Sequence, residues 1–564
     1  MDLRLERTRR WRQPLNEAWL YPSLAILSVL YFLPDVTLHA NPYDEGVIVY
    51  GALRVLRGEL PYRDWWTMYP PGQFYLLAAL FKLFGPSLLV ERVSNILIRS
   101  SLVLLAWRIT APFVSRSTAL LCWLVGTVWL GRFSPFGSSV LIALLLSMTS
   151  VLLLERHSID PTSPLRLLLG GMAAGATAVF RHDVGFYASL AGLIVLTFSA
   201  STGTVTESGS WARVASRMQG ILLYVLGVAI IVLPVALCLV IAVPLKEVIE
   251  DLIIFPAHVF PSVRALPYPR PPGLSLFLNG SLSLRSYLSY SLTALPYYVV
   301  PLVFVLSMLL LVGRPHVQDS LDRARRWTIL HLTLLAGALF PQILVRADLP
   351  HLLVFSVPVL LLLPLGQGIL KRPSGGASYL PAVAALVLLL PMLVEPVYVK
   401  ARVILGPPTE ALPRSGDWST LPERRLGYAV ADPDELAAVG YIVDHVGPGE
   451  RIFVGLWTHR RVETNDVLFY FLADRDSATR YHELHPGVAT TERVQGEIAK
   501  DLAARDVRYV VLWSGADAES TTAANREEGA ALLDAYLTRN YRHSATFGAY
   551  SIFVRDLSQG SGAL

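Results

Sequence analysis

Apolar runs of roughly bilayer-crossing length recur over the first 400 residues of this 564-residue chain. A helix needs about 20 mostly apolar residues to cross a membrane and must bond its own backbone polar groups there. Hydrophobic residues make up 53% of the chain and charged residues 16%, with a mean hydropathy of +0.48. The sequence therefore predicts a polytopic α-helical membrane protein with about 11 transmembrane helices. The candidate spans lie near 19–38, 93–114, 117–131, 136–154, 165–180, 183–200, 219–243, 296–312, 327–345, 350–370 and 379–397.

The cysteines and the net charge exclude several other classes. The two cysteines, Cys122 and Cys238, lie in apolar runs, so the sequence offers neither a disulfide framework nor a cysteine-based metal site. A net charge of +5 needs no nucleic-acid partner, because an excess of Lys and Arg normally sets the orientation of a membrane protein. The basic N-terminal segment precedes a run of full span length without a small-residue cleavage site, so we expect 19–38 to be a retained span.

Residues 71–85 decide the topology. This apolar stretch is short for a span, follows Pro70 and contains Lys82. If it does not cross, the basic N-terminus and the short basic loops share the cytoplasmic face, as the positive-inside rule requires. If it crosses, the later basic loops move outside. We therefore expect juxtamembrane helices in the first outer loop and a cytoplasmic N-terminus. The basic loop residues are Arg116, Arg156, Arg166, Arg213, Arg217, Arg314, Arg323, Arg325, Arg326, Lys371 and Arg372.

The composition changes near residue 400, where a second domain is expected. Residues 1–400 form the multi-span domain, 401–427 have the composition of a linker, and 428–564 are more polar. Helical spacing alternates there with the apolar strands RIFVGLW, VRYVVLWS and AYSIFV. This pattern predicts a small α/β domain, and an odd number of spans makes it extracytoplasmic. The loop that contains His459 is expected to be solvated.

Three polar groups of residues lie on the predicted outer face. Each also has a plain structural alternative: a solvated pair of acids, an interfacial anchor with a capping acid, and a salt bridge in a tight turn. A long loop at 244–295, rich in Pro and Tyr, can cover a site formed by these groups. The three groups are Asp44 and Glu45; Arg181, His182 and Asp183; and Arg346, Asp348 and His351.

Four segments carry a resemblance to a known family. In order, they are YDEG, GELPYRDW, YPPGQFYLLAALFKLFG and VERVSNILIRSS. Together they resemble the polyprenyl-phosphate-sugar-dependent glycosyltransferases of superfamily C, of the protein O-mannosyltransferase and aminoarabinose-transferase type. The resemblance implies a polyprenyl-phosphate-linked sugar as donor, a lipid, protein or glycan acceptor, and a place in the cell inner or plasma membrane. It covers roughly the first 200 residues and does not identify the sugar.

The resemblance implies a catalytic role for Asp44 and Glu45. Asp44 is the expected base for a single displacement with inversion, and Glu45 either orients it or helps to hold a divalent metal ion. Cations are needed to stabilise the departing phosphate. Arg99 lies inside a predicted span, where a charge is expensive, so pairing with another buried group is its alternative role. The expected donor-phosphate-binding residues are Arg181, His182, Arg346, His351 and Arg99.

Further substrate contacts are expected from Asp64, Trp65, Trp66, Asp183 and Asp348. Trp65 and Trp66 can stack on a sugar ring or an isoprenoid, although tryptophan at a bilayer interface is more often an anchor. Asp64 is a candidate second acid. These enzymes commonly carry a second carboxylate in their second outer loop, and here that loop, LGRFSPFG, contains no acid. The missing acid weakens the prediction of a divalent metal site held by two acids, and Asp44 is better supported as a lone base.

A different functional class remains as an alternative. A non-catalytic polytopic scaffold or lipid-binding subunit, with an outer domain that binds partners, would keep the fold and tolerate loss of all the polar groups. No GxSxG, HExxH or paired CxxC motif points to another enzyme class. A transporter is less favoured, because few charges lie inside the spans.

Overall fold

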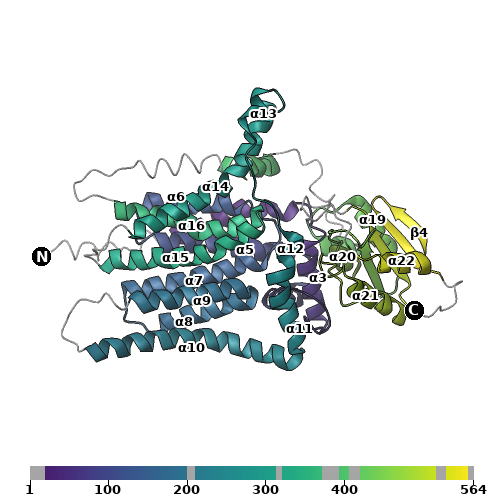
Figure 1. Ribbon diagram of the computed structural model, residues 1–564, viewed down its shortest axis with the longest axis horizontal. Helices are drawn as coiled ribbons and strands as arrows, with labels where there is room; N and C mark the ends of the chain where they lie inside the picture. The colour runs from purple at the N-terminus through teal and green to yellow at the C-terminus, as the bar shows by residue number, and fades with distance from the viewer. Residues whose placement is uncertain are drawn as a thin grey trace.

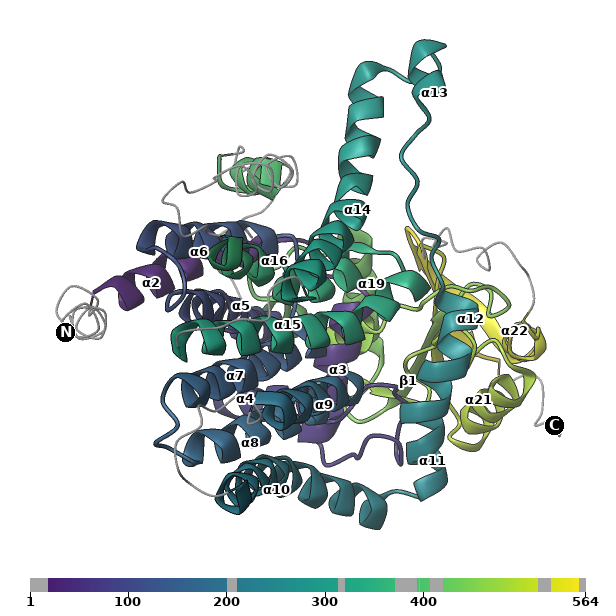
Figure 2. The ribbon, with the colours of Figure 1, turned by 60° about the vertical axis from the view of Figure 1, so that its left-hand side comes forward.

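The computed structural model describes residues 19–199, 210–312, 320–370, 393–394, 396–405, 419–515 and 529–556. Its elements form a bundle of long helices and a C-terminal α/β domain. The long helices lie side by side, and the C-terminal domain packs against one end of the bundle (Figure 1). Between the two parts lie α3 (Asp44–Leu56), α11 (Leu245–Ile249) and α12 (Phe260–Arg264) (Figures 1 and 2). The predicted membrane fold with a small C-terminal α/β domain is confirmed.

Seven helices in the described part of the chain are long and apolar enough to cross a membrane. The number of about 11 spans stays a prediction, and most of its last candidate, 379–397, lies outside the described residues. Shorter apolar helices are α6 (Arg116–Leu130) and α8 (Leu165–Phe180), and α5 (Leu88–Thr110) carries buried charges. The seven are α2 with η2 (Leu20–Phe32, Leu33–Thr37), α7 (Ser139–Ile159), α9 (His182–Ser199), α10 (Ser210–Ala242), α14 (Leu284–Val312), α15 (Ser320–Val345) and α16 (Leu349–Leu370).

Glycine allows α8 and α10 to approach closely. A Cβ atom on Gly171 would lie 1.9 Å from the backbone oxygen of Tyr224, and one on Gly227 would lie 2.1 Å from that of Leu168. Both distances are far below van der Waals contact, so any larger residue would push the helices apart. Elsewhere α10 exposes large apolar side chains such as Leu233, as expected for a helix that faces lipid.

A short helix follows α3 in the connection between α2 and α5. This helix, α4 (Gly72–Phe84), starts after two prolines and ends at Gly85, whose φ of +85° favours glycine. At 13 residues and about 1.5 Å per residue, α4 is about 20 Å long, which is less than the hydrocarbon thickness of about 30 Å. The length agrees with the expectation of a juxtamembrane helix at 71–85.

The C-terminal domain contains a five-stranded sheet with the order β2-β1-β3-β5-β4. The central strand pairs are parallel between β1 and β3 and antiparallel between β3 and β5. Ile452 and Val454 of β1 pack against α19 (Pro433–His445), whereas Phe453 packs with α21 (Glu492–Ala504) and α22 (Leu532–Asn540) on the other face. The predicted strands are present. They are β1 (Arg451–Leu456), β2 (Asp476–Ser477), β3 (Tyr509–Trp513), β4 (Tyr541–Phe547) and β5 (Tyr550–Arg555).

The domain boundaries at 400 and 428 stay predictions. Residues 406–418 lie outside the described part, and α18 (Leu421–Leu426) falls within the predicted linker.

The C-terminal domain is joined to the start of α3 by backbone contacts. The Ala40 N–H donates to the Val430 carbonyl at 2.7 Å, and the Leu468 N–H of α20 (Leu468–Ala473) donates to the Pro42 carbonyl at 2.8 Å. A Cβ on Gly46 would lie only 2.3 Å from the Leu468 nitrogen. Glycine at this position therefore lets α3 and α20 touch through their backbones.

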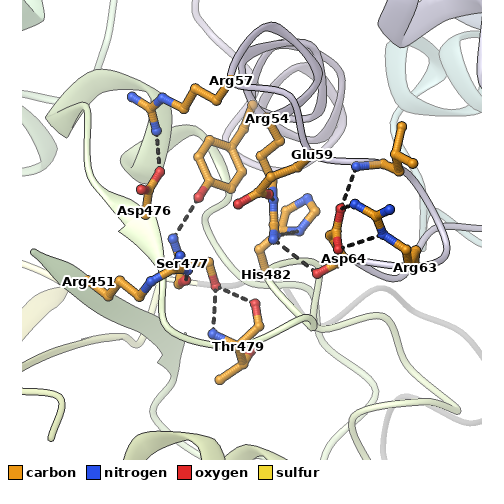
Figure 3. A network of polar contacts seen from close by, with 12 residues as sticks. Arg54, Arg57, Glu59, Arg63, Asp64, Arg451, Asp476, Ser477, Thr479 and His482 are labelled. Carbon is orange, nitrogen blue, oxygen red and sulfur yellow. Dashed lines mark hydrogen bonds and ion pairs between the residues drawn. The ribbon is translucent and has the colours of Figure 1, made fainter. Parts of the chain in front are cut away.

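Side chains complete this contact along α3 (Figure 3). Nη1 of the buried Arg54 lies 2.9 Å from Nδ1 of His482, and the Ser477 N–H donates to the Tyr50 hydroxyl at 2.7 Å. Arg57 pairs with Asp474 and Asp476 at the edge of the contact. The chain segment that carries His482 is thereby held against the first connection of the bundle.

Candidate active site

Asp44 is the first residue of α3. The side-chain oxygen of Asn41 accepts hydrogen bonds from the backbone N–H groups of Tyr43 (3.1 Å) and Asp44 (2.6 Å), which fixes the turn before the helix. In the first helical turn, unbonded N–H groups favour a carboxylate. Asp44 is exposed, whereas the residues after it, 45–54, are buried. It is thus a positioned acid that solvent or a ligand can reach.

Glu45 has the opposite environment. Its fully buried carboxylate forms a two-point ion pair with Arg92 of α5, with Nε to Oε1 at 2.8 Å and Nη2 to Oε2 at 2.9 Å. Arg92 also donates to the carbonyls of Asp35, Leu38 and His39. Glu45 therefore fastens α3 to α5 and to the end of η2.

Arg181 lies between α8 and α9 and is held by Asp183. The guanidinium donates twice to the carboxylate, Nε to Oδ1 at 2.9 Å and Nη2 to Oδ2 at 2.6 Å. Gln342 of α15 also donates to Asp183, at 2.8 Å. His182 begins α9, and its buried Nδ1 has no hydrogen-bond partner among the described residues. The group thus joins α9 to α15 at the same end of the bundle.

Arg346 and His351 share one acid at the junction of α15 and α16. Arg346 Nε donates to Asp348 at 2.6 Å, and His351 Nδ1 lies 2.5 Å from the other oxygen of the same carboxylate. Burial acts to raise the pKa of Asp348, but the hydrogen bond from His351 and the charges of His351 and Arg346 lower it below its usual value. Arg346 Nη1 also donates to the carbonyl of Arg264 at 2.7 Å. Asp348 is therefore a carboxylate that holds two basic side chains.

These groups converge around two tyrosines. The Tyr69 hydroxyl lies within electrostatic range of Asp44, Glu483, Arg181 and Arg264, and burial raises its pKa. The Tyr43 hydroxyl interacts with Glu483, Arg264 and Asp44. Arg346 donates to the carbonyl of Arg264, so one member of the third polar group bonds to a residue that lies within electrostatic range of both tyrosines.

Two residues of this site were missed by sequence reasoning. Arg264 ends α12, in the loop at 244–295 that was expected to cover the site, but no motif distinguished it from other loop arginines. Glu483 comes from the C-terminal domain and accepts a hydrogen bond from the Tyr43 hydroxyl at 3.0 Å. Since 440 residues separate these two partners along the chain, no local pattern could have paired them.

Arg99 lies apart from these residues, in a second ionic group. It is fully buried on α5 and lies 2.8 Å from Asp35, which also pairs with Lys400. Its guanidinium stacks on the ring of Phe32 at 4.5 Å. Arg99 therefore has the buried acidic partner that its alternative role required.

Asp64, Trp65 and Trp66 lie in the contact with the C-terminal domain. Asp64 pairs with Arg63 and accepts from the Leu60 N–H at 2.7 Å, beside Arg54 (Figure 3). The Trp65 ring is 0% exposed and packs edge-on against Phe74 and His482. Trp66 is 4% exposed and packs against Phe255 and His485. Neither ring presents an open face in this structure.

The described residues contain no group of three or more His, Cys, Asp or Glu side chains placed to hold a metal ion. The second predicted outer loop, where a second acid was expected, instead carries Arg132, whose guanidinium lies 5.6 Å from the centre of the Trp129 ring. The possible divalent ion stays a prediction.

The expectation of a solvated loop around His459 is wrong for His459 itself. Its side chain is 2% exposed, its Nδ1 lies 2.7 Å from Asp534, and its Nε2 accepts from the Leu456 N–H. Asp534 lies on α22, so the pair fastens that helix to the end of β1. The basic run THRR gave no sign of this distant acid.

Comparison with known proteins identifies the fold. No protein-family model matches the sequence, and no curated protein is significantly similar. ArnT from Cupriavidus metallidurans bound to undecaprenyl phosphate is similar in structure, with a TM-score of 0.52 at 14% identity over 97% of this chain and 100% of that one. The same protein in the apo state gives a TM-score of 0.52 at 14% identity, over 97% and 99% of the two chains. The chain therefore shares its fold with ArnT from Cupriavidus metallidurans, in agreement with the resemblance of its N-terminal segments.

Proposed function

We propose that this protein is a membrane glycosyltransferase that moves a sugar from a polyprenyl-phosphate donor to an acceptor on the extracytoplasmic face. The observation that carries the proposal is that the exposed acid Asp44 lies, like Arg181 and Arg264, within electrostatic range of the Tyr69 hydroxyl, and that Arg346 donates to the Arg264 carbonyl at 2.7 Å. A base and a group of cations are the two things that sugar transfer from a lipid phosphate requires. The fold supports the same reaction class.

The proposed reaction is a single displacement with inversion. Asp44 accepts the proton of the acceptor while the acceptor atom bonds to the anomeric carbon. The bond between that carbon and the phosphate oxygen breaks, and polyprenyl phosphate leaves with its negative charge. Arg181 and Arg346 stabilise this charge through charge-assisted hydrogen bonds. Glu45, paired with Arg92, fixes the helix that carries Asp44.

Asp183 and Asp348 are proposed to position the cations. Each carboxylate holds one arginine by its Nε atom, which sets the direction of the guanidinium. His351 shares Asp348 with Arg346, and His182 follows Arg181 in the sequence, so both histidines are included in the proposed phosphate site. Direct stacking of Trp65 or Trp66 on a sugar would require the loop to move, because both rings are buried.

A small cleft with a volume of about 20 Å³ lies next to the proposed phosphate-binding group. Its walls come from α3, α4, α5, α7 and α8 and include Leu76, Leu77, Ile98 and Phe180. Phe180 is the last residue of α8 and directly precedes Arg181.

The test is the Asp44→Asn variant of the full chain in lipid nanodiscs. We expect this variant to bind undecaprenyl phosphate as the wild type does. Its turnover is measured as the rate at which undecaprenyl phosphate is released from a panel of undecaprenyl-phosphate sugars. This rate should fall at least about 100-fold, because a general base contributes about 10²–10⁴-fold. Asp160→Asn, at an exposed acid between α7 and α8, is the matched control and keeps wild-type turnover. Equal turnover of Asp44→Asn and the control would favour the lipid-binding scaffold instead.

A further inference from the structure

Glu483 is a buried acid that the C-terminal domain contributes to the site. Its side chain is 1% exposed, and Oε1 accepts a hydrogen bond from the Tyr43 hydroxyl at 3.0 Å. The second oxygen, Oε2, is buried and has no hydrogen-bond partner among the described residues. A buried polar atom without a partner costs about 1–3 kcal/mol, so a ligand that bonds to Oε2 would recover this cost.

Charged groups from several elements lie within electrostatic range of Glu483. Asp44 of α3, Asp251 of η4 (Glu250–Val259) and Arg264 of α12 act on its carboxyl group. Glu483 in turn acts on the Tyr69 hydroxyl, as Asp44, Arg181 and Arg264 do. His485, two residues further along, interacts with Arg264 and Arg346. Glu483 therefore belongs to the same group of side chains as the proposed base and cations.

We propose that Glu483 is an acceptor-positioning residue, which binds a hydroxyl acceptor through Oε2 beside Asp44. The inference rests on the proposed transferase function and adds to it the chemical class of the acceptor. A hydroxyl oxygen has two lone pairs and one proton. One lone pair accepts the Glu483 hydrogen bond, the other attacks the anomeric carbon, and the proton passes to Asp44. A neutral amine has a single lone pair and cannot accept this hydrogen bond while it attacks.

The protonation of Glu483 supports this role. Burial raises the pKa of Glu483 to about 8, with Asp44 and Asp251 raising it further and Tyr43 and Arg264 opposing the shift. At neutral pH the carboxyl group is mostly protonated, so it can donate a hydrogen bond. Above pH 8 it would become a second negative charge next to Asp44, which disfavours both the donor phosphate and the hydrogen bond to the acceptor.

The experiment compares pH profiles of sugar transfer in the full chain. In the wild type we expect kcat/KM for a hydroxyl acceptor to fall about tenfold per pH unit above an apparent pKa of about 8. Glu483→Gln keeps a donor but cannot ionise, so it lowers kcat/KM by about 3–10-fold at pH 7 and abolishes the alkaline fall. Glu483→Ala removes the donor and raises the acceptor KM by about 10–100-fold, with the donor KM unchanged.

Two controls isolate the effect. The first control is Glu497→Gln. Glu497 is also a glutamate of the C-terminal domain that accepts a hydrogen bond from a tyrosine hydroxyl, Tyr481 at 2.5 Å, but its side chain is 40% exposed. We expect this variant to keep the wild-type pH profile. Burial raises the pKa of Asp251 to about 7, so Asp251→Asn tests whether that acid causes the alkaline fall. We expect the alkaline fall of kcat/KM to persist in Asp251→Asn.

A second readout does not depend on activity. The folded chain holds the Glu483 proton more tightly than the unfolded chain, so the stability that this group contributes is full below pH 4.5 and is lost as pH rises towards about 8. The midpoint temperature of thermal unfolding should therefore fall less between these pH values in Glu483→Gln than in the wild type.

The outcomes separate the two proposals. An alkaline fall that persists in Glu483→Gln, a fall that Asp251→Asn removes, or a Glu483→Ala variant with wild-type acceptor KM would overturn the role of Glu483. If transfer depends on Asp44 in those same experiments, the proposed function stands. A wild-type protein that transfers no sugar overturns both.

Discussion

Two ionic groups in this molecule differ in whether they include an acid that is exposed to solvent. The bundle group consists of Glu45 with Arg92, and of Asp35 with Arg99 and Lys400. The site group consists of Asp44, Glu483, Arg181, Arg264 and Arg346. In the bundle group each of the two acids lies within ion-pair distance of a cation, and the side chains are almost completely shielded from solvent.

The site group includes an exposed acid. Asp44 is open to solvent, and Oε2 of Glu483 is buried without a hydrogen-bond partner among the described residues. Ion pairing makes a buried charge part of the structure, because removing one partner strands the other. An exposed acid can instead be reached by a ligand. Adjacent residues, Asp44 and Glu45, thus have different roles because one is exposed and the other faces α5.

The largest expected effect is loss of stability in Glu45→Gln. This change leaves the Arg92 guanidinium buried without its counter-charge, and breaking a buried ion pair costs about 3–5 kcal/mol. Thermal unfolding in detergent should show a greatly lowered midpoint, whereas Asp44→Asn should differ little from the wild type. If a Glu45→Gln protein unfolds at the wild-type temperature but transfers no sugar, Glu45 is a catalytic residue. The assignment of Glu45 to a purely structural ion pair would then be wrong.

Part of the fold and of the site group could be predicted from the sequence. Spans, the short helix at 71–85 and the strands followed from local periodicity, and Asp44, Arg181 and Arg346 stood out because charged residues next to apolar runs are unusual. The partner of Glu45 was not predicted, although Arg92 lies in a segment that carried the family resemblance. A pair that joins two helices depends on their packing, which periodicity does not reveal.

Residues from the C-terminal domain were the hardest to predict. Glu483 reaches Tyr43 only because α20 packs on Gly46 and because the backbone of Pro42 is bonded to Leu468. The same contact buries Trp65, although a tryptophan in such a sequence is more often expected to be an anchor at the bilayer interface. Long-range docking of this kind has no signature in a single sequence.

A smaller effect is expected when one cation of the site group is removed. Arg346→Gln deletes a charge that we propose to bind phosphate, and a hydrogen bond to a charged group is worth about 1.5–3 kcal/mol, or about 10–150-fold in affinity. Titration with undecaprenyl phosphate measures this loss. Arg270→Gln, at an exposed arginine of the loop at 244–295, is the matched control and should bind as the wild type does. Equal affinity of the two variants would remove Arg346 from the phosphate site.

The smallest effect is expected at the rim of the contact between the bundle and the C-terminal domain. Arg57 pairs with Asp474 at 2.5 Å and also with Asp476, but its side chain is 30% exposed, and such pairs contribute about 0–1 kcal/mol. Arg57→Ala should therefore lower the unfolding midpoint only slightly and change sugar transfer less than twofold. The buried backbone bonds at Pro42 and the packing of Gly46 on Leu468 remain in this variant. If Arg57→Ala instead abolishes transfer without unfolding the protein, the position of Glu483 relative to Asp44 depends on surface charge. High salt should then inhibit the wild type as well.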